Sequence, residues 1–157
     1  MVRLKGWNPR GERLVGDVPM GQWETVTFIA GFRQSGIVAP MVIKGAMNGE
    51  AFLVYIEKCL VPTLKRRDIV VIDNVSFHKV AGVAEAIRAG GAELRYLPQY
   101  SPDLNPIEMP YSKFKAYMRK RAERTGAGVR SAIRSFLPSL KGQECANYLS
   151  HAGYASI

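Results

Sequence analysis

The pattern of apolar and polar positions begins with two runs that are typical of a β-hairpin. Residues 25–30 and 37–43 are rich in β-branched and aromatic side chains, and the turn-forming sequence GFRQSG separates them. Pro40 lies in the second run and cannot donate to a ladder, so we expect it at an edge or a bulge. A further short strand is predicted near residues 13–15, after the turn-rich start of the chain.

The rest of the chain alternates between helical and strand periods. Residues 69–72 (IVVI) form a continuous apolar run, which is typical of a strand buried on both faces. The predicted strands are residues 69–72 and 93–97, and the predicted helices are about 48–62, 79–89, 108 onward, 128–140 and 143–151. A hairpin followed by helix, strand, helix, strand and helix indicates an α/β fold with helices packed on a mixed sheet. The ribonuclease-H type has this order, and other mixed sheets share the pattern.

Composition is that of an ordinary globular domain. At 157 residues and 47% hydrophobic content, the chain is long enough for one domain with its own core. No apolar run could span a membrane, and the N-terminal MVRLKGWNPRGER lacks the apolar segment of a signal peptide. Cys59 and Cys145 show no disulfide or zinc spacing, which fits a reducing compartment. We therefore expect a cytoplasmic protein that does not associate with membranes.

The net charge of +9 is unevenly distributed. Residues 1–110 carry 13 Lys and Arg against 11 Asp and Glu, whereas residues 111–157 carry nine against two. We expect residues 111–157 to be a basic helical C-terminal part of the same domain. A concentrated positive field attracts polyanions, most often nucleic acid, but a solvated helix face explains the charge equally well.

Two acids occur where α/β folds often place functional groups. Asp73 directly follows the apolar run 69–72, at the carboxyl end of a predicted strand. Glu108 follows a proline-rich loop, and 34 residues lie between the two acids. Each has a structural alternative. Asp-Asn after a strand is a common turn or cap, and the sequence NPIE at 105–108 resembles a capping box.

Taken together, the two acids suggest a metal site. A strand-end Asp and a Glu that opens a neighbouring helix can meet at one edge of a sheet. Mg²⁺ takes one or two carboxylates per ion and fills other positions with water and phosphate. Phosphodiester cleavage uses two such ions about 4 Å apart. The pattern therefore predicts a Mg²⁺ or Mn²⁺ site beside the basic helix that begins near Lys113.

The sequence DNVSFHK followed by LPQYSPDLNPIE resembles the DDE superfamily endonuclease domain of bacterial insertion-sequence transposases, which are relatives of mariner elements. GWNPRGERL, GAMNGEAF, LVPTLK, GAELRYLP, KFKAYMRK and ECANYLSHAGY also resemble segments of that family, so the likeness covers nearly the whole chain. It implies a ribonuclease-H-like fold, two metal ions in the complete enzyme and a nucleoid-associated bacterial protein. It also implies DNA as the partner, as transposon ends and as target. In this family, strand cleavage is followed by attack of the 3′-hydroxyl on target DNA.

The resemblance assigns roles to individual residues. Asp73 matches the second metal-binding acid and Glu108 the third, with the interval expected for this branch. His78 falls where the family often has a histidine, although packing or capping at a helix start is its alternative. The residues implied at the edge of the site are Asn74, His78, Ser101 and Asn105. The residues implied to contact DNA phosphates are Lys113, Lys115, Arg119, Lys120 and Arg121.

The chain departs from the family pattern at its start. The family's first catalytic Asp lies on the first strand, upstream of GWNPRGER, so we expect an N-terminally incomplete domain that lacks this strand. Glu12 and Asp17 follow no apolar strand and match no acid of the motif. The expected protein partners are a second copy in a homodimer and a separately encoded N-terminal half.

Pro110 is a second departure, two residues after Glu108. If Pro106 opens the helix, Pro110 is interior and costs about 3 kcal/mol. If Pro110 opens the helix, Glu108 lies just outside it. With either start, we expect Glu108 to point in a different direction from the matching residue of the family.

Two functions follow from the sequence. The first is a transposase catalytic domain with metal-dependent DNA cleavage and strand transfer. The second is a DNA-binding remnant that lacks the first acid and does not cleave. A cellular nuclease of ribonuclease-H type is a third reading, without support from the SPDLNPIE loop. Whether this chain alone is an enzyme stays open on sequence grounds.

Overall fold

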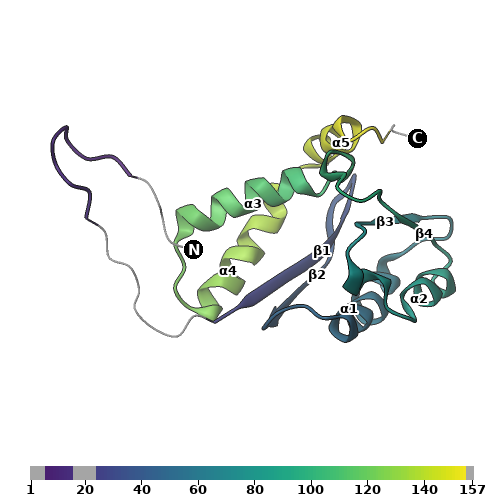
Figure 1. The fold of residues 1–157 in the computed structure, drawn as a ribbon. Helices are drawn as coiled ribbons and strands as arrows, with labels where there is room; N and C mark the ends of the chain where they lie inside the picture. Colours follow the sequence, from purple (N-terminus) through teal and green to yellow (C-terminus); the bar gives the residue numbers. More distant parts are fainter. Residues whose placement is uncertain (1–5, 16–23, 155–157) are drawn as a thin grey trace.

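A computed structural model describes residues 6–15 and 24–154 (Figure 1). Across these residues the elements follow the predicted order of hairpin, helix, strand, helix, strand and helices. The strands are β1 (Val26–Arg33), β2 (Gly36–Lys44), β3 (Ile69–Ile72) and β4 (Glu93–Tyr96). The helices are α1 (Gly49–Tyr55), α2 (Val83–Ala89), α3 (Glu108–Arg121), α4 (Gly126–Phe136) and α5 (Gly142–His151).

The predicted hairpin is confirmed. β1 and β2 pair antiparallel, with Arg33 opposite Gly36, so the connecting turn is only Gln34-Ser35. Both strands are longer than predicted because residues of the GFRQSG segment join them. The register shifts beside Ala30, where β2 carries an extra residue and Ala39 has a φ of 49°. Pro40 is exposed at this irregularity, so the expected bulge is also confirmed.

The predicted helix over 48–62 is confirmed as three consecutive segments. Asn48 caps α1, because its side chain accepts a hydrogen bond from the Ala51 N–H at 2.8 Å. The chain then continues as a π-helical turn, Ile56–Leu60, and a 3₁₀ turn, Val61–Thr63. The backbone becomes extended at Leu64.

α2 begins at Val83, four residues later than predicted. Ser76–Lys79 form a separate 3₁₀ turn, Val80 is extended, and Gly82 has a φ of 94°. The helix starts after this left-handed glycine, whose N–H donates to the Glu85 carboxylate at 3.1 Å. The helix was predicted to begin too early because Val80 is apolar and packs on the same core as the helix without belonging to it.

The predicted strand near residues 13–15 is wrong. Residues 6–15 form an exposed segment that contains a turn and no strand. An isolated extended segment is unstable without a ladder partner. Asp17 lies outside the described residues.

Helices lie on opposite sides of the hairpin (Figure 1), and the described residues form one core cluster on each side. Ile29 and Met41 pack on the first cluster, whereas Phe28 and Val42 pack on the second, as the two-residue period of strands requires. The first cluster joins α1, the turn after it and α2: Phe52, Tyr55, Ile56, Leu60, Val83, Ile87 and Ala92. The second joins α3, α4 and α5, which confirm the predicted C-terminal helices: Phe114, Ile133, Phe136, Leu140 and Cys145.

The strands form two two-stranded sheets, β1–β2 and β3–β4, in place of the continuous sheet that the sequence suggests. β3 pairs in parallel with β4, from Ile69 opposite Glu93 to Ile72 opposite Tyr96. The expectation that β3 is buried on both faces is wrong, because Ile69 is 52% exposed. β3 has β4 as its one ladder partner within the part of the chain that the structure describes, so its other edge is open.

Candidate metal and nucleic-acid site

Asp73 lies directly after β3, where the parallel ladder with β4 ends. Its side chain is 46% exposed, and Oδ1 contacts Nδ1 of His78. The strand therefore presents the carboxylate at its carboxyl end, as the sequence predicts, with one oxygen engaged and the other available.

His78 contacts Asp73 and packs among aromatic side chains. It lies in the 3₁₀ turn Ser76–Lys79, and its side chain is only 14% exposed. The ring packs on Phe52 at a centroid distance of 4.1 Å and on Phe77 at 4.3 Å. Packing thus holds the imidazole in place while Nδ1 contacts Asp73, so His78 orients that carboxylate from a fixed position.

Glu108 is the first residue of α3, and its side chain is exposed. The expected capping box is wrong, because the N-cap is Ile107 and no side chain caps the helix. The helix begins at Glu108, where the apolar period predicts it, and the two starts at Pro106 and Pro110 are wrong. Pro110 is the third helical residue, where a missing N–H costs no intrahelical bond, and it is fully buried. Glu108 therefore points from the first turn of a helix that the proline does not disrupt.

The loop before Glu108 is held by local turns and by the end of the chain. Pro102–Leu104 form a 3₁₀ turn, and Glu108 N donates to the Asn105 carbonyl at 3.1 Å. Tyr154 donates its hydroxyl to the Leu104 carbonyl at 2.9 Å. Sequence reasoning missed Tyr154, because a contact across 50 residues leaves no local signal.

A cavity of about 240 Å³ brings the predicted residues together. Its lining includes Asp73, His78, Asn105 and Glu108, so two acids and two site-edge residues that are distant in the sequence share one space. Ser101 is not part of this lining, and its hydroxyl donates to the Gln99 carbonyl at 3.3 Å. The remaining walls are apolar and include Phe28 and other residues of the hairpin and second core cluster.

The donor set suits a hard cation. Asp73 and Glu108 supply carboxylate oxygens, the ligand type that Mg²⁺ and Mn²⁺ prefer. Asn74, the residue after Asp73, is not part of the cavity lining, and among the described residues its buried Oδ1 has no hydrogen-bond partner. Within residues 6–15 and 24–154 no group of three or more His, Cys, Asp or Glu side chains is arranged so that it could hold a metal ion. The described residues thus fit a site of two carboxylates in which other groups complete the coordination.

α3 runs from this cavity toward a basic end. Arg119, Lys120 and Arg121 occupy its last turn and are exposed. Lys113 is engaged within the chain, because its ammonium donates to both carboxylate oxygens of Glu144 at 2.7 and 2.9 Å. This contact, with help from a tyrosine hydroxyl, holds the pKa of Glu144 below its ordinary value.

Two further predicted phosphate contacts, Lys115 and Arg121, also have intrachain neighbours. Lys115 lies 5.0 Å from the centroid of the Tyr111 ring, a cation–π arrangement. Arg121 forms an ion pair with Glu123, with Nη2 and Oε1 2.7 Å apart. A surface pair of this kind is weak, so it leaves the guanidinium accessible to a phosphate.

Sequence comparison assigns the chain to a known group. The profile of the DDE superfamily endonucleases matches residues 1–127. The chain belongs to this family. The match includes Asp73, His78 and the whole loop up to Glu108, so every residue that lines the cavity except Phe136 lies within the matched region. No curated protein matches the chain in a sequence comparison.

The fold is that of solved Mos1 transposase structures. The Mos1 strand transfer complex superposes with a TM-score of 0.73 at 17% identity, covering 94% of this chain and 46% of that chain. The Mos1 mariner paired end complex with Mn gives 0.71 at 15% identity, covering 94% and 47%. The Mos1 catalytic domain with Raltegravir and Mg gives 0.60 at 17% identity, covering 83% and 75%.

These matches confirm the predicted ribonuclease-H-like α/β fold class. The chain spans about half the length of the Mos1 chains in the DNA complexes. Among the described residues, none of the helices is long and apolar enough to cross a membrane.

Proposed function

We propose that this chain supplies the metal-binding and DNA-binding part of a transposase that cuts and joins DNA strands. The observation that carries the proposal is the cavity lined by both Asp73 and Glu108. The chain belongs to the DDE superfamily endonucleases, and this membership supports a role for the two acids in cutting nucleic acid. The solved Mos1 structures of the same fold include complexes described with Mn and with Mg.

Each residue has a separate task in this proposal. Asp73 and Glu108 would hold Mg²⁺ or Mn²⁺, and His78 would keep one oxygen of Asp73 oriented. A bound ion of this kind polarises a phosphodiester and lowers the pKa of a water. Arg119, Lys120 and Arg121 would contact backbone phosphates, which positions DNA without reading its sequence. Transposon ends and target DNA are the proposed substrates.

A second candidate function is DNA binding without cleavage. The observation that favours it is that two carboxylates line the cavity, whereas no group of three or more His, Cys, Asp or Glu among the described residues is arranged to hold a metal ion. A two-metal reaction needs carboxylates that bridge the ions as well as ligands for each ion. A chain with only two acids in place would retain phosphate contacts and lose catalysis.

Plasmid nicking by the purified chain tests both candidates. We expect Asp73→Ala and Glu108→Ala to abolish any Mn²⁺- or Mg²⁺-dependent conversion of supercoiled DNA to open circles, because each removes a ligand. Asp103→Ala is the matched control, since Asp103 is an exposed acid of the same loop and is absent from the cavity lining.

The outcomes separate the two functions. Nicking that is lost in both site variants and retained in Asp103→Ala supports the catalytic proposal. Binding that weakens steeply with salt, without nicking by the unmodified chain, supports the second candidate. Nicking that is unchanged in Asp73→Ala would contradict the assignment of the site.

A further inference from the structure

A groove of about 690 Å³ lies against α2 and β4 and shares no lining residue with the cavity around Asp73. Along β4 it extends from Glu93 to Tyr96, the first and last residues of the strand. Figure 1 shows α2 and β4 at one end of the molecule and the last turn of α3 at the other. The groove is therefore a surface separate from the basic end of α3.

Three arginines line the groove: Arg66, Arg67 and Arg88. All three are exposed, and among the described residues none of their guanidinium groups has a hydrogen-bond or ion-pair partner. One acid, Glu93, lines the same groove, and its Oε1 already lies 2.9 Å from Nε of Arg95. Cations that gather without paired acids create a positive field that attracts a polyanion. The groove thus carries a local excess of positive charge.

Two of these arginines are carried by a turn that is fixed to its neighbour. Arg66 and Arg67 form the turn before β3, and Arg67 N donates at 2.9 Å to the carbonyl of Gly91, in the turn after α2. Gly91 has a φ of 81°, and a Cβ added there would lie 3.4 Å from Cγ of Arg66. A glycine suits both the left-handed backbone and the close approach. The two turns therefore hold the arginines in fixed relative positions.

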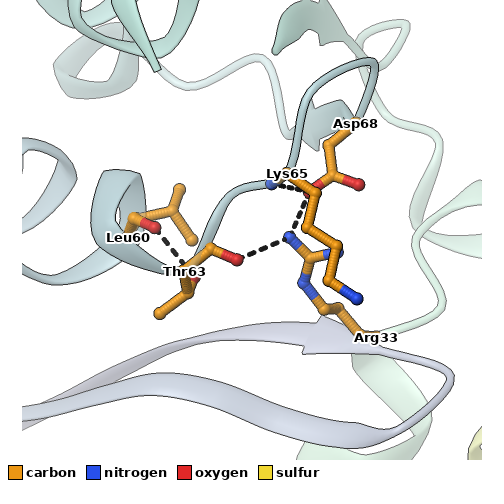
Figure 2. Close-up of polar contacts among 5 residues, drawn as sticks. All are labelled: Arg33, Leu60, Thr63, Lys65 and Asp68. Carbon is orange, nitrogen blue, oxygen red and sulfur yellow. Dashed lines mark hydrogen bonds and ion pairs between the residues drawn. The ribbon is translucent and has the colours of Figure 1, made fainter. Parts of the chain in front are cut away.

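The turn before β3 is closed by Asp68 (Figure 2). The Asp68 carboxylate accepts from Lys65 N at 2.7 Å and from the Arg33 guanidinium, which also donates to the Thr63 carbonyl at 3.2 Å. Asp68 is thus engaged within the turn and with β1, and it does not neutralise the groove. Arg67 has a φ of 71°, a region that favours glycine. An arginine in this strained position indicates a role for its side chain.

The other end of the groove carries an aromatic ring and a further cation. Tyr96 is 38% exposed, and Lys79 Nζ lies 5.8 Å from the centroid of its ring. The Tyr96 hydroxyl donates at 3.2 Å to the carbonyl of His78, the residue that contacts Asp73. The groove therefore leads from the arginines toward the candidate metal site.

The length of the groove matches the spacing of phosphates in DNA. A parallel strand rises about 3.3 Å per residue, so the first and last residues of β4 are about 10 Å apart. One strand of a DNA duplex carries a phosphate about every 3.4 Å along the helix axis. About three phosphates therefore fit along the groove, which three guanidinium groups line. Arginine suits this partner because its planar N–H donors bind phosphate oxygens in pairs.

Cations beside an edge strand can also serve only to keep the strand from pairing with another chain. The cation of β4 itself is Arg95, and it is paired with Glu93. The three groove arginines belong instead to a turn and to α2, so protection of the strand edge does not explain them.

We propose that this groove, lined by Arg66, Arg67 and Arg88, binds the phosphate backbone of duplex DNA on the side of the acid pair opposite to the last turn of α3. DNA would then be held on both sides of Asp73 and Glu108. The choice of DNA as the polyanion rests on the proposed function, whereas binding in the groove needs no metal ion.

Modification of arginines by phenylglyoxal, followed by mass spectrometry of the full chain, tests this contact. The probe is a DNA duplex of arbitrary sequence with about three helical turns, or about 30 base pairs, in the presence of EDTA. We expect saturating duplex to slow the modification of Arg66, Arg67 and Arg88 severalfold. Arg95 is the internal control, since it lies on β4 outside the groove lining and is paired with Glu93.

The same measurement separates the groove from the basic end of α3. Protection of Arg119 and Arg121 without protection of the groove arginines would overturn the groove proposal and leave the proposed function standing. Absence of any DNA binding would contradict both. Because EDTA prevents nicking, a failed nicking test leaves protection in the groove unaffected.

Substitutions measure how much the groove contributes to binding. Arg66→Gln and Arg88→Gln should each lower the salt slope of duplex binding by about one in fluorescence anisotropy. Glutamine keeps Cγ of residue 66, which lies beside Gly91, so the turn should stay folded, and an unchanged Tm checks this. Lys58→Gln is the control, because Lys58 is exposed and outside the groove lining. An equal loss in Lys58→Gln would reduce the effect to net charge and contradict the proposal.

Two competitors test whether DNA is the occupant. Poly-L-glutamate that protects the groove arginines as well as DNA does, at the same concentration of negative charge, would assign the groove to an acidic protein partner. Equal protection by inorganic phosphate alone would reduce the groove to a site for a single anion. Stronger protection by the duplex than by either competitor is the result that we expect.

Discussion

Asp68 and Asp73 flank the same strand and have opposite environments. Asp68 precedes β3 and is bound by Arg33, a permanent cation whose partner is supplied by the fold. Asp73 follows β3, contacts the ring of His78 and is nearly half exposed. The first carboxylate is neutralised within the protein, whereas the second retains an oxygen for a ligand. Sequence position alone does not distinguish the two acids.

Asp68 should make folding stability dependent on pH. The hydrogen bond from Arg33 holds the pKa of Asp68 below its ordinary value of 3.8. A lowered folded-state pKa stabilises the protein above the unfolded-state pKa, and the contribution disappears as the pH falls through the folded-state value. Asp68→Asn should therefore lower the free energy of unfolding at pH 7, and its difference from the unmodified chain should shrink below about pH 4. Urea denaturation across pH measures both.

Glu93→Gln is a suitable control for this prediction. The Glu93–Arg95 pair is about 60% exposed on each side, and such pairs contribute roughly 0–1 kcal/mol. A difference between Asp68→Asn and the unmodified chain that stays constant from pH 7 to pH 3 would show that the ion pair does not carry this stability.

α3 links the candidate site to the basic surface. Its first residue is Glu108, and its last turn carries Arg119, Lys120 and Arg121. The helix rises about 1.5 Å per residue, so the acid and the cations are separated by most of its length. In the proposed function, one helix would therefore position both a metal ligand and phosphate contacts on the same DNA. The ammonium of Lys113 makes two short contacts, both with the carboxylate of Glu144 in α5.

The basic end of α3 should bind DNA through phosphates. Arg119→Ala and Arg121→Ala should each weaken binding to unrelated DNA sequences by a similar factor and lower the salt slope by about one. Lys113→Ala should have a smaller effect, because its ammonium is already paired. Fluorescence anisotropy at several salt concentrations measures both quantities. Lys44→Ala is the control, since Lys44 ends β2 and lies outside this helix. Equal slopes in all four variants would contradict the phosphate role.

At the scale of the whole molecule, the hairpin is the layer that joins two cores. One of its faces packs on α1 and α2, and the other packs on α3, α4 and α5. The second cluster includes the aromatic pairs Phe114–Phe136 and Tyr117–Phe136, at 5.1 and 5.4 Å. Because β1 packs on both clusters, a substitution that destabilises one cluster should also destabilise the other.

The two clusters should therefore unfold together. Ile87→Ala in the first cluster should cost about 2–5 kcal/mol and Phe136→Ala in the second about 3–5 kcal/mol. Both should lower the midpoint of one urea transition followed by circular dichroism. Leu104→Ala is the control, since Leu104 is 44% exposed, and it should change stability by less than about 1 kcal/mol. Two separate transitions, with each variant affecting only one, would contradict the shared layer.

Much of the local structure could be predicted because it depends on short-range chemistry. The alternating runs predict the hairpin, and the four apolar residues before Asp73 predict β3 with its correct bounds. The start of α2 could not be predicted from the period of its apolar residues, because a left-handed glycine decides it. The apolar period predicts α3 from residue 108, but the local sequence at Asn105 and Pro106 wrongly suggests a cap, because the N-cap is Ile107.

By itself the sequence determined the order of elements, the identity of the two acids and the DDE family, because these depend on local periodicity and on a short motif. The tertiary structure alone decided which groups meet. It placed Asp73 and Glu108 around one cavity and bound Lys113 to Glu144. These outcomes depend on packing between residues far apart in the chain, and no local pattern encodes the distance between two strands.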